Sequence, residues 1–332
     1  MRVALLEVDH WHVGMYVDGL RDVDGVEIVA VSDANVGCAR SWGESIGCAA
    51  YGSAADLLDR ERVDFVFAFA PHYRMIGLAR LLVEREQPFA MEKPMALDAA
   101  DLAPLVEGIE SSGMFAGVAF VRRMGGYGGA LLRMREELGP IHHFQGRFIG
   151  GPMQRYVDDG CPWVLRREHA GGGCMINFGT HFIDLFLQLV REPVTRVFCQ
   201  TSNRLHGETV EDLASVFMRT ESGAVATLES GYLIPAEPKE DTIAVSAEHA
   251  YVGNEGTKWG GPTFAFRDGR VVKAPEGEPD YADYVADVVR RFRAGEPPIA
   301  DVASMARVLS CVNAAYASAE SGEPTAPSLY PN

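Results

Sequence analysis

The sequence has no stretch in which lysine and arginine gather, and its overall charge is acidic. The 332 residues carry a formal net charge of -16 at pH 7. A chain of this charge repels the phosphate backbone of nucleic acids, and no local basic run offsets the repulsion. Nucleic acid is therefore not an expected partner.

The cysteines include no C-x-x-C pair and are scattered over the chain, at Cys38, Cys48, Cys161, Cys174, Cys199 and Cys311. This spacing is typical of reduced thiols that pack as small hydrophobic side chains. It predicts neither a disulfide framework nor a structural zinc site.

Long apolar runs are not evident either. The opening MRVALLEVD turns acidic after a short apolar run, which is too short for the core of a signal peptide. With no apolar stretch of about 18 residues, neither a membrane-spanning helix nor a membrane partner is predicted. These features predict a cytoplasmic protein.

Hydrophobic residues make up 47% of the chain and charged residues 23%, a composition suited to two domains with proper cores. In the first third, almost continuously apolar runs alternate with helical patterns: RVALL, GVEIVAVSD, VDFVFAFAP, PFAMEKP and MFAGVAF. Such runs are typical of strands buried on both faces of a parallel sheet. We expect residues 1–121 to form an α/β, Rossmann-type domain with a doubly wound parallel sheet and right-handed crossovers.

After residue 121 the pattern changes to successive strand-like runs, several of them joined by turn signals such as ESG and RDG. The runs are IHHFQGRFIGG, VTRVFCQTS, DLASVFMRT, AVATLESGYLI, DTIAVSAEHAYVG and TFAFRDGRVV. They predict that residues 122–332 form an α+β domain around a mostly antiparallel sheet of five or more strands. Two helical segments close the chain, and Gly322 is the expected C-cap of the second.

Glycine is missing from the turn after the first strand, where a dinucleotide-binding fold usually keeps it. In the register of G-x-G-x-x-G, the segment LLEVDHWHVGMY places Glu7, Asp9 and His12 at the three glycine positions. Glycine there permits the tight bend, the approach of the backbone to a pyrophosphate and helix–strand packing. A carboxylate about 5 Å from a phosphate charge is unfavourable by roughly 3 kcal/mol at an effective dielectric of about 20. The turn is therefore expected to weaken dinucleotide binding.

Three motifs stand in one order across nearly the whole chain: MEKP at 91–94, GGGCMINFGTHFIDLF at 171–186, and the ending NAAYASAESG. Together they resemble the glucose-fructose oxidoreductase / inositol dehydrogenase / MocA family of two-domain dehydrogenases. The segments GVEIVAVSD, VDFVFAFAP, GVAFVRR and LGPIHHFQGRF also fall where that family keeps matching ones. The resemblance implies a nicotinamide cofactor on the first domain and hydride transfer at a hydroxyl-bearing carbon of a sugar or cyclitol. It also implies a homodimer or homotetramer formed through the sheet of the second domain.

Oxidation of an alcohol needs a group that removes the hydroxyl proton and a cation or donor that stabilises the developing alkoxide. Lys93 and His181 fit these two needs. Because Pro94 follows Lys93, the strand must end there, and the lysine is expected at the carboxyl edge of the sheet, where ligands bind in open α/β folds. We expect the Lys93 and His181 side chains to meet across the cleft between the domains.

Asn177, His181 and Asp184 are spaced to share one face of a helix. The resemblance implies that Lys93, His181 and Asn177 are catalytic, and that these residues contact substrate together with Arg123 and Asp184. Asn177 stands where the family usually has an aspartate, and an amide cannot stabilise a histidinium as a carboxylate does. Proton transfer by His181 is therefore expected to be weakened.

The cofactor-binding residues that the resemblance implies are Asp9, His10, Trp11, His12, Asp33, Pro71, His72, Glu92 and Lys93. The family's usual threonine-proline-asparagine run is altered to APHYRM here, which keeps Pro71 and places His72 after it. Asp33, at the end of the second strand, is placed to accept from ribose hydroxyls and disfavours a 2′-phosphate. NAD is therefore the preferred cofactor over NADP.

Three interpretations of the glycine-poor turn stay open. In the first, Asp9 caps the following helix, Trp11 packs between helix and strand, and the fold has lost its dinucleotide. In the second, the turn rearranges, or an arginine or metal ion offsets the charge, and the cofactor still binds. In the third, Asp9, His10 and His12 ligate a metal ion; D-H-x-H matches no closed ligand set, so no metal site is predicted.

The function predicted from these features is an NAD(P)-dependent oxidoreductase acting on a hydroxyl of a sugar, cyclitol or related small polyol. The alternative is a cofactor-free or non-redox relative: a ligand-binding or partner protein, or a lyase or isomerase that uses Lys93 and His181 for acid–base chemistry. The set of motifs favours the oxidoreductase, whereas the replaced glycines favour the alternative.

Overall fold

The computed structural model describes residues 1–235, 239–253, 263–274 and 281–328. Its first sheet is parallel and six-stranded, with the order β3-β2-β1-β4-β5-β6. The strands are β1 Arg2–Leu6, β2 Glu27–Ser32, β3 Ala49–Tyr51, β4 Phe65–Ala68, β5 Phe89–Met91 and β6 Ala116–Val118. The predicted parallel sheet is confirmed. Sequence reasoning missed β3 because three residues are too few to show a hydrophobic pattern.

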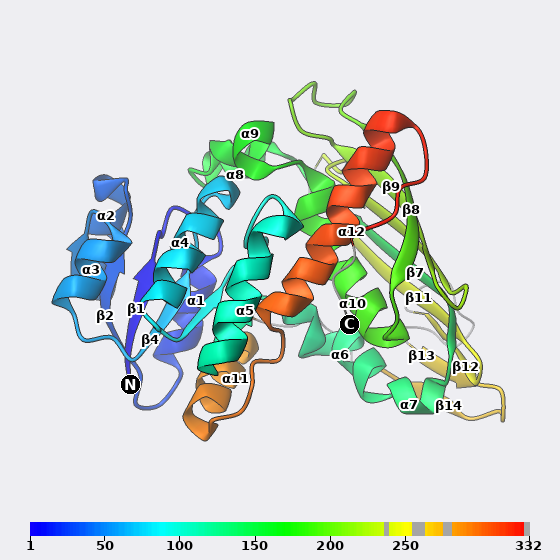
Figure 1. Cartoon of the computed structure of the whole chain (residues 1–332), viewed down its shortest axis with the longest axis horizontal. Helices are drawn as coiled ribbons and strands as arrows, with labels where there is room; N and C mark the ends of the chain where they lie inside the picture. The colour runs from blue at the N-terminus through cyan, green and yellow to red at the C-terminus, as the bar shows by residue number, and fades with distance from the viewer. Residues whose placement is uncertain (236–238, 254–262, 275–280, 329–332) are drawn as a thin grey trace.

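Helices cover both faces of this sheet (Figure 1). They are α1 Val13–Arg21, α2 Val36–Ile46, α3 Ala54–Arg60, α4 His72–Glu84, η1 Ala99–Leu102 and α5 Ala103–Ser112. Alternate residues of β1 belong to two separate hydrophobic clusters, Ala4 and Leu6 to one and Val3 and Leu5 to the other. Burial on both faces explains why the runs of this domain are continuously apolar.

A helix from the last third of the chain also belongs to the first domain. Helix α11 (Tyr281–Ala294) packs against α1, and its Tyr284 and Val285 join the hydrophobic cluster that contains Val3. The contact is close: a Cβ on Gly19 of α1 would lie 2.9 Å from the Cα of Ala282. The predicted boundary at residue 121 falls between the two sheets but is wrong for α11.

The second sheet has eight strands in the order β14-β13-β12-β11-β7-β10-β9-β8. The strands are β7 Ile141–Ile149, β8 Val194–Ser202, β9 Leu213–Thr220, β10 Val225–Gly231, β11 Glu240–Ala247, β12 Ala250–Gly253, β13 Thr263–Phe266 and β14 Val271–Lys273. All neighbours are antiparallel except β7 and β10. The predicted antiparallel sheet is confirmed, although the run at 241–253 forms two strands, β11 and β12.

The other helices of the second half are mostly short and lie between the sheets or against the second one (Figure 1). They are η2 Val121–Arg123, α6 Gly126–Arg133, α7 Arg135–Leu138, α8 Gln154–Asp158, η3 Pro162–Leu165, α9 Arg167–Ala170, the π-helical turn η4 Met175–Gly179, α10 Thr180–Val190 and α12 Val302–Ser321. Gly322 caps α12 in the left-handed conformation, with φ 75°, as predicted.

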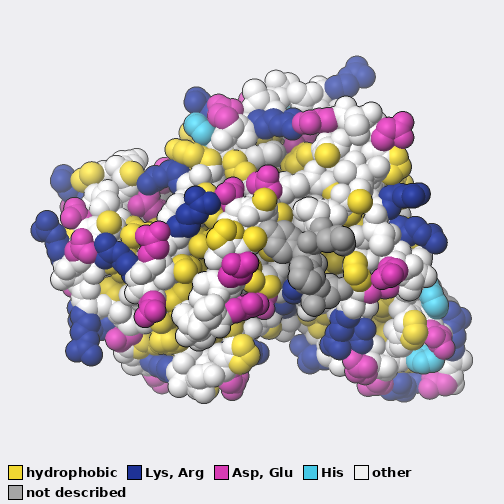
Figure 2. All heavy atoms as spheres, viewed as in Figure 1, with side chains coloured by type: hydrophobic (Ala, Val, Ile, Leu, Met, Phe, Trp, Pro, Cys, Tyr) yellow, Lys and Arg dark blue, Asp and Glu magenta, His cyan; other side chains and the backbone are white. Residues whose placement is uncertain are grey.

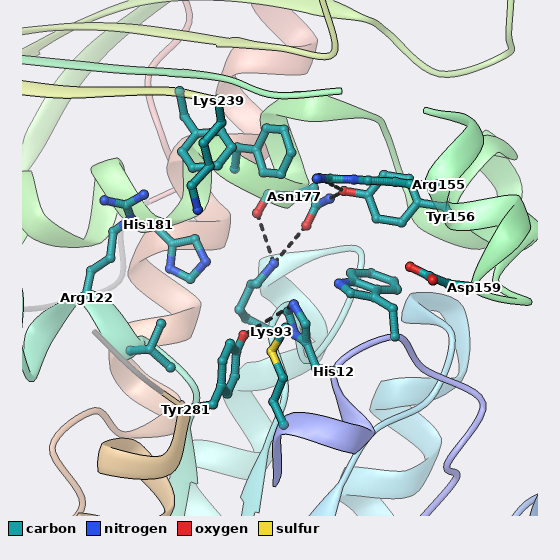
Figure 3. A pocket seen from close by; sticks show the side chains of 15 residues that line it. His12, Lys93, Arg122, Arg155, Tyr156, Asp159, Asn177, His181, Lys239 and Tyr281 are labelled. Atoms are coloured by element: carbon teal, nitrogen blue, oxygen red, sulfur yellow. Dashed lines mark hydrogen bonds between the residues drawn. The ribbon is translucent and has the colours of Figure 1, made fainter. Parts of the chain in front are cut away.

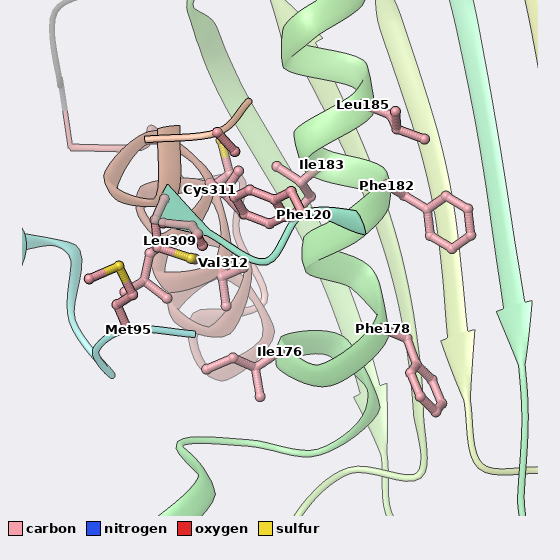
Figure 4. Packing of buried hydrophobic residues seen from close by; sticks show 14 of the residues in the cluster. Met95, Phe120, Ile176, Phe178, Phe182, Ile183, Leu185, Leu309, Cys311 and Val312 are labelled. Carbon is pink, nitrogen blue, oxygen red and sulfur yellow. The ribbon is translucent and has the colours of Figure 1, made fainter. Parts of the chain in front are cut away.

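Helix α10 lies between α12 and the second sheet (Figure 4). Phe178 and Phe182 point toward the strands, and Ile183 points toward α12. Gly146 of β7 makes room for this packing, because a Cβ there would lie 2.6 Å from the Phe182 ring. This packing fixes the position of the helix that carries His181.

One stretch, Arg167–Val190, is long and apolar enough to cross a membrane, and the sequence expectation did not identify it. Within its most apolar window, 78% of the residues are buried inside the fold, which is typical of a core helix.

On the face that Figure 2 shows, acidic and basic side chains are interspersed, and that face carries no continuous basic field.

The three glycines at 171–173 let this segment pass close to its neighbours. A Cβ on Gly171 would lie 2.7 Å from Leu97 of the first domain, and a Cβ on Gly173 would lie 2.0 Å from the Glu211 carbonyl oxygen. The buried Glu211 carboxylate accepts hydrogen bonds from the amides of Gly173 and Met175. These contacts anchor the start of the segment that carries Asn177 and His181.

Replacing Gly173 by alanine is therefore expected to destabilise the fold by about 1–3 kcal/mol or more, because backbone must shift to admit the methyl group. The control is Gly77→Ala in α4, where no atom lies within 4 Å of the new Cβ. That variant is expected to be neutral or slightly stabilising, since alanine favours helices. Urea unfolding of both variants measures the difference, and equal stabilities would contradict the packing argument.

Candidate active site

A cavity of about 510 Å³ opens between the two domains (Figure 3). From the first domain, the lining comes from the β1–α1 turn, from Lys93 after β5 and from α11. From the second domain, it comes mainly from α8 and the helical segment 175–190. The lining residues are Trp11, His12, Met15, Lys93, Val121, Arg122, Phe148, Arg155, Tyr156, Asp159, Asn177, Phe178, His181, Lys239 and Tyr281.

Lys93 is held at the carboxyl edge of the parallel sheet, two residues after β5 ends. Its Nζ donates to both the backbone oxygen and the Oδ1 of Asn177, each at 2.9 Å. The residue is only 2% exposed. Burial lowers the pKa of Lys93 to about 8, although the Glu92 carboxylate opposes the change. A lysine with this pKa can exchange a proton near neutral pH.

Asn177 holds Lys93 rather than His181. While Oδ1 accepts from Lys93, Nδ2 donates to the hydroxyls of Tyr156 at 2.7 Å and Tyr232 at 3.0 Å. Both N–H donors of the amide are thereby used. Asn177 lies in the π-helical turn that precedes α10, so the regular spacing assumed from the sequence does not apply. The sequence expectation considered Asn177 for its effect on His181, whereas the structure shows its amide bound to Lys93, Tyr156 and Tyr232.

His181 faces the same cavity as Lys93, as predicted (Figure 3). Burial lowers the pKa of His181 well below its ordinary value, and the nearby charges of Lys93 and Arg122 lower it further. Its Nδ1 is buried without a hydrogen-bond partner among the described residues. The ring is therefore neutral at pH 7 and can hydrogen-bond a substrate oxygen.

Arg123 and Asp184 pair with each other and do not belong to the cavity lining. The Nε of Arg123 donates to Asp184 Oδ2 at 2.8 Å, and the pair is almost fully buried. Arg123 also donates to the Ile299 carbonyl oxygen. The expectation that both residues contact substrate is corrected, because each charge needs the other once both are removed from water. The neighbouring Arg122 faces the cavity instead, while paired with Asp241.

The glycine-poor turn keeps a backbone shape suited to glycine. Glu7 has φ 58°, in the left-handed region, and its carboxylate forms an ion pair with Arg74 at 2.6 Å. Asp33 accepts hydrogen bonds from the amides of Asp9 at 2.8 Å and Asn35 at 2.6 Å. Helix α1 starts at Val13, so Asp9 is not its N-cap, and the first interpretation is wrong on that point.

Trp11 packs across the domain boundary and not between helix and strand. Its ring stacks on His10 at a centroid distance of 4.0 Å and contacts Tyr156 at 5.0 Å and Trp163 at 5.6 Å. His72 also bridges the domains, because its buried Nδ1 lies 2.8 Å from the Ala170 carbonyl oxygen. Neither His72 nor Pro71, which precedes α4, lines the cavity.

Comparison with known proteins identifies this architecture. The model of an oxidoreductase family with an NAD-binding Rossmann fold matches residues 12–120, and the GFO/IDH/MocA C-terminal domain matches residues 132–252. The chain belongs to the GFO/IDH/MocA family. The family expected from the motifs is thus confirmed.

Two relatives illustrate the range of this similarity. A putative UDP-kanosamine synthase oxidoreductase subunit from Amycolatopsis mediterranei is 30% identical over 165 residues, which cover 50% of this chain and 45% of that protein. D-apiose dehydrogenase from Paraburkholderia graminis is 28% identical over 244 residues, which cover 69% of this chain and 63% of that protein. The chain thus spans about half to two thirds of the length of these relatives.

Among solved structures, the WlbA dehydrogenase from Bordetella pertussis in complex with NADH and UDP-GlcNAcA shares the fold. Its TM-score is 0.83 at 21% identity, over 99% of both chains. Myo-inositol 2-dehydrogenase from Lactobacillus plantarum gives a TM-score of 0.82 at 19% identity, also over 99% of both chains. The two-domain fold of this GFO/IDH/MocA protein is therefore shared with these structures over nearly their whole length.

The turn of this family member does not fit a pyrophosphate in the usual position. The amides of His12 and Val13 already donate to the Nδ1 and carbonyl oxygen of His10, both at 3.2 Å. Burial raises the pKa values of the Glu7, Asp9 and Asp33 carboxyls, which is the effect expected where carboxylates gather with little water. These contacts and charges oppose a pyrophosphate in the turn as it stands, and a rearranged turn that binds the cofactor stays a prediction.

Sequence reasoning missed several residues of the site, among them Tyr281, Tyr156 and Arg155. Tyr281 reaches His12 from α11, with its hydroxyl 2.9 Å from Nδ1. No local pattern marks these residues, because their neighbours in space are distant in sequence. Arg122 stands beside Arg123 in the VRR segment, and only the structure shows which of the two faces the cavity.

We expect the natural chain to bind NADH weakly, with Kd of about hundreds of micromolar or above, and Glu7→Gly with Asp9→Gly to tighten binding by about tenfold or more. The double change removes two carboxylates. It also leaves Arg74 without its ion pair to Glu7, so that the guanidinium can bind the pyrophosphate of NADH. Calorimetric titration at matched salt measures the effect.

The matched control for this experiment is Asp22→Gly with Asp24→Gly, which removes the same charge from exposed positions at the far end of α1. Its NADH affinity is expected to equal that of the natural chain. Micromolar binding by the natural chain would contradict the electrostatic argument.

Proposed function

We propose that this protein is an oxidoreductase that acts on a hydroxyl of a sugar, cyclitol or related polyol in the cavity between its domains. The observation that carries the proposal is that Lys93 and His181, from different domains, line one cavity. Family membership supports the reaction class. The relatives named as apiose and inositol dehydrogenases support a polyol substrate.

Lys93 is the proton-transfer group in this proposal. With a pKa of about 8, it is mostly protonated at pH 7 and donates to the oxygen of a carbonyl substrate, and above pH 8 it accepts the hydroxyl proton. His181, neutral at these pH values, orients the same oxygen by a hydrogen bond. The Lys93 ammonium also stabilises an alkoxide.

The proposed cofactor is a nicotinamide dinucleotide, which supplies or accepts the hydride when bound. The NAD-binding family description and the NADH complex of WlbA support it. NAD is proposed over NADP, because the buried Asp33 carboxylate at the end of β2 repels a 2′-phosphate.

The far wall of the cavity suggests the kind of sugar. Arg122, Arg155 and Lys239 line it with the rings of Phe148 and Tyr156, in a chain whose net charge is -16. Apolar ring faces pack against sugar rings, and guanidinium groups bind carboxylates and phosphates. A sugar that carries an anionic substituent therefore suits this wall better than a neutral one.

The proposal also includes the oligomeric state and the cellular compartment of the protein. Phe217 of β9 and Tyr251 of β12 are exposed on the second sheet, at 52% and 48%, and support a homodimer or homotetramer formed through that sheet. A cytoplasmic enzyme that binds neither nucleic acid nor membranes agrees with the acidic charge of the chain.

Lys93→Ala and His181→Ala are each expected to lower turnover by about two to four decades, because each change removes one acid–base or electrostatic group. The assay follows NADH absorbance with a panel of neutral sugars, sugar acids and nucleotide sugars. Arg80→Ala, at an exposed ion pair with Asp101, is the control and should keep full activity. Unchanged turnover in both cavity variants would remove these residues from the mechanism.

Asn177→Asp is expected to move to higher pH the limb of kcat/KM that reports Lys93, which is the acidic limb for oxidation of a hydroxyl and the alkaline limb for reduction of a carbonyl. The new carboxylate would lie near Lys93 Nζ and stabilise its protonated form, so the midpoint should rise from about 8 to about 9 or above. Asn203→Asp, at an exposed position, should leave the profile unchanged. An unshifted limb in the Asn177 variant would show that another group titrates there.

A further inference from the structure

Two histidines and a glutamate converge at the β1–α1 corner of the cavity. One ligating atom each from His10, His12 and Glu92 can be chosen so that all lie within 4.8 Å of one another. His12 Nδ1 and Glu92 Oε1 are 3.1 Å apart. In a tetrahedral zinc site, with bonds of about 2.0–2.1 Å, neighbouring ligand atoms are roughly 3.3 Å apart.

His10 supplies an independent observation at this cluster. The residue is 5% exposed, and its Nε2 is buried without a hydrogen-bond partner among the described residues. Its other nitrogen, Nδ1, accepts a long 3.2 Å hydrogen bond from the His12 amide. An unpaired ring nitrogen at this depth is unfavourable, and a coordination bond would satisfy the imidazole.

The cluster also has the surrounding hydrogen bonds that orient metal ligands. Tyr16 donates its hydroxyl to Glu92 Oε1 at 2.8 Å, and the Lys93 amide donates to Oε2. The Tyr281 hydroxyl lies 2.9 Å from His12 Nδ1. Such outer partners fix ligand orientation and tune affinity.

We propose that His10, His12 and Glu92 bind one divalent transition-metal ion, with zinc as the best match. Two imidazoles and one carboxylate are the ligand set of many catalytic zinc sites, whereas magnesium and calcium favour oxygen ligands alone. Asp9, which the sequence pattern grouped with the two histidines, is replaced in the cluster by Glu92, 80 residues from His12.

In this proposal the ion keeps one coordination position for a further ligand, and its charge offsets the carboxylates of the neighbouring turn. Of the three ligands only His12 lines the cavity, as Lys93 does, so we place the fourth position on the His12 side of the ion. An ion of charge +2 with one carboxylate ligand leaves net positive charge at a turn that otherwise carries Glu7, Asp9 and Asp33. Each neutral imidazole ligates through the lone pair of one nitrogen and keeps its proton on the other. The His12 amide therefore loses its contact with His10 Nδ1 whichever nitrogen of His10 ligates, because Nδ1 then either binds the ion or carries the ring proton.

The test uses the full-length chain after dialysis against a chelator. Titration with Zn²⁺ by calorimetry is expected to show one equivalent bound at micromolar or lower Kd, and Co²⁺ is expected to give the visible absorption of a low-coordinate site. His12→Ala and Glu92→Gln should each weaken binding at least tenfold. The control is His142→Ala, at an exposed position on β7, and should bind as the natural chain does.

Circular dichroism checks that each variant folds. If the buried Glu92→Gln variant fails to fold, His12→Ala decides, because that side chain is 15% exposed and tolerates truncation better. Less than half an equivalent of Zn²⁺ in the natural chain, or binding unaffected by His12→Ala, would overturn the proposal and leave a hydrogen-bonded His12–Glu92 pair. The readout involves no turnover, so its result is independent of the oxidoreductase proposal.

Discussion

A buried cation lies at the junction of the two domains. Lys93 leaves the first domain at the end of β5, is 2% exposed, and places its ammonium against two oxygens of Asn177 in the second domain. A buried ammonium without such acceptors is strongly unfavourable. The charge of Lys93 therefore favours the packing of the two domains that brings Asn177 against it. His181, four residues further along, then faces the same cavity.

The same principle explains the turn that lacks glycines. Two carboxylates at this turn have partners: Glu7 pairs with Arg74, and Asp33 accepts hydrogen bonds from the amides of Asp9 and Asn35. These contacts stabilise the turn in a shape of its own, and they use groups that a dinucleotide would need. The chain has the family's fold, and the corner where the resemblance places a phosphate-binding turn contains the imidazoles of His10 and His12.

The β1–α1 corner also contains a residue from the last third of the chain. Helix α11 packs on α1 and brings Tyr281 to His12, which in turn lies against Glu92 at the end of β5. Three segments that are separated by 80 and 269 residues therefore meet within hydrogen-bond distance. The chemistry available to the cavity depends on this meeting as much as on Lys93 and His181.

The sequence by itself determined the two sheets, the place of Lys93 at a strand end and the family, because hydrophobic runs, proline and motif order are local properties of the chain. It did not determine which polar residues pair. Arg123 and Asp184, expected at the substrate, neutralise each other 61 residues apart, and Asn177 holds Lys93 because a π-helical turn precedes α10. Pairing of buried charges depends on which segments the topology brings together, and only the tertiary structure decides that.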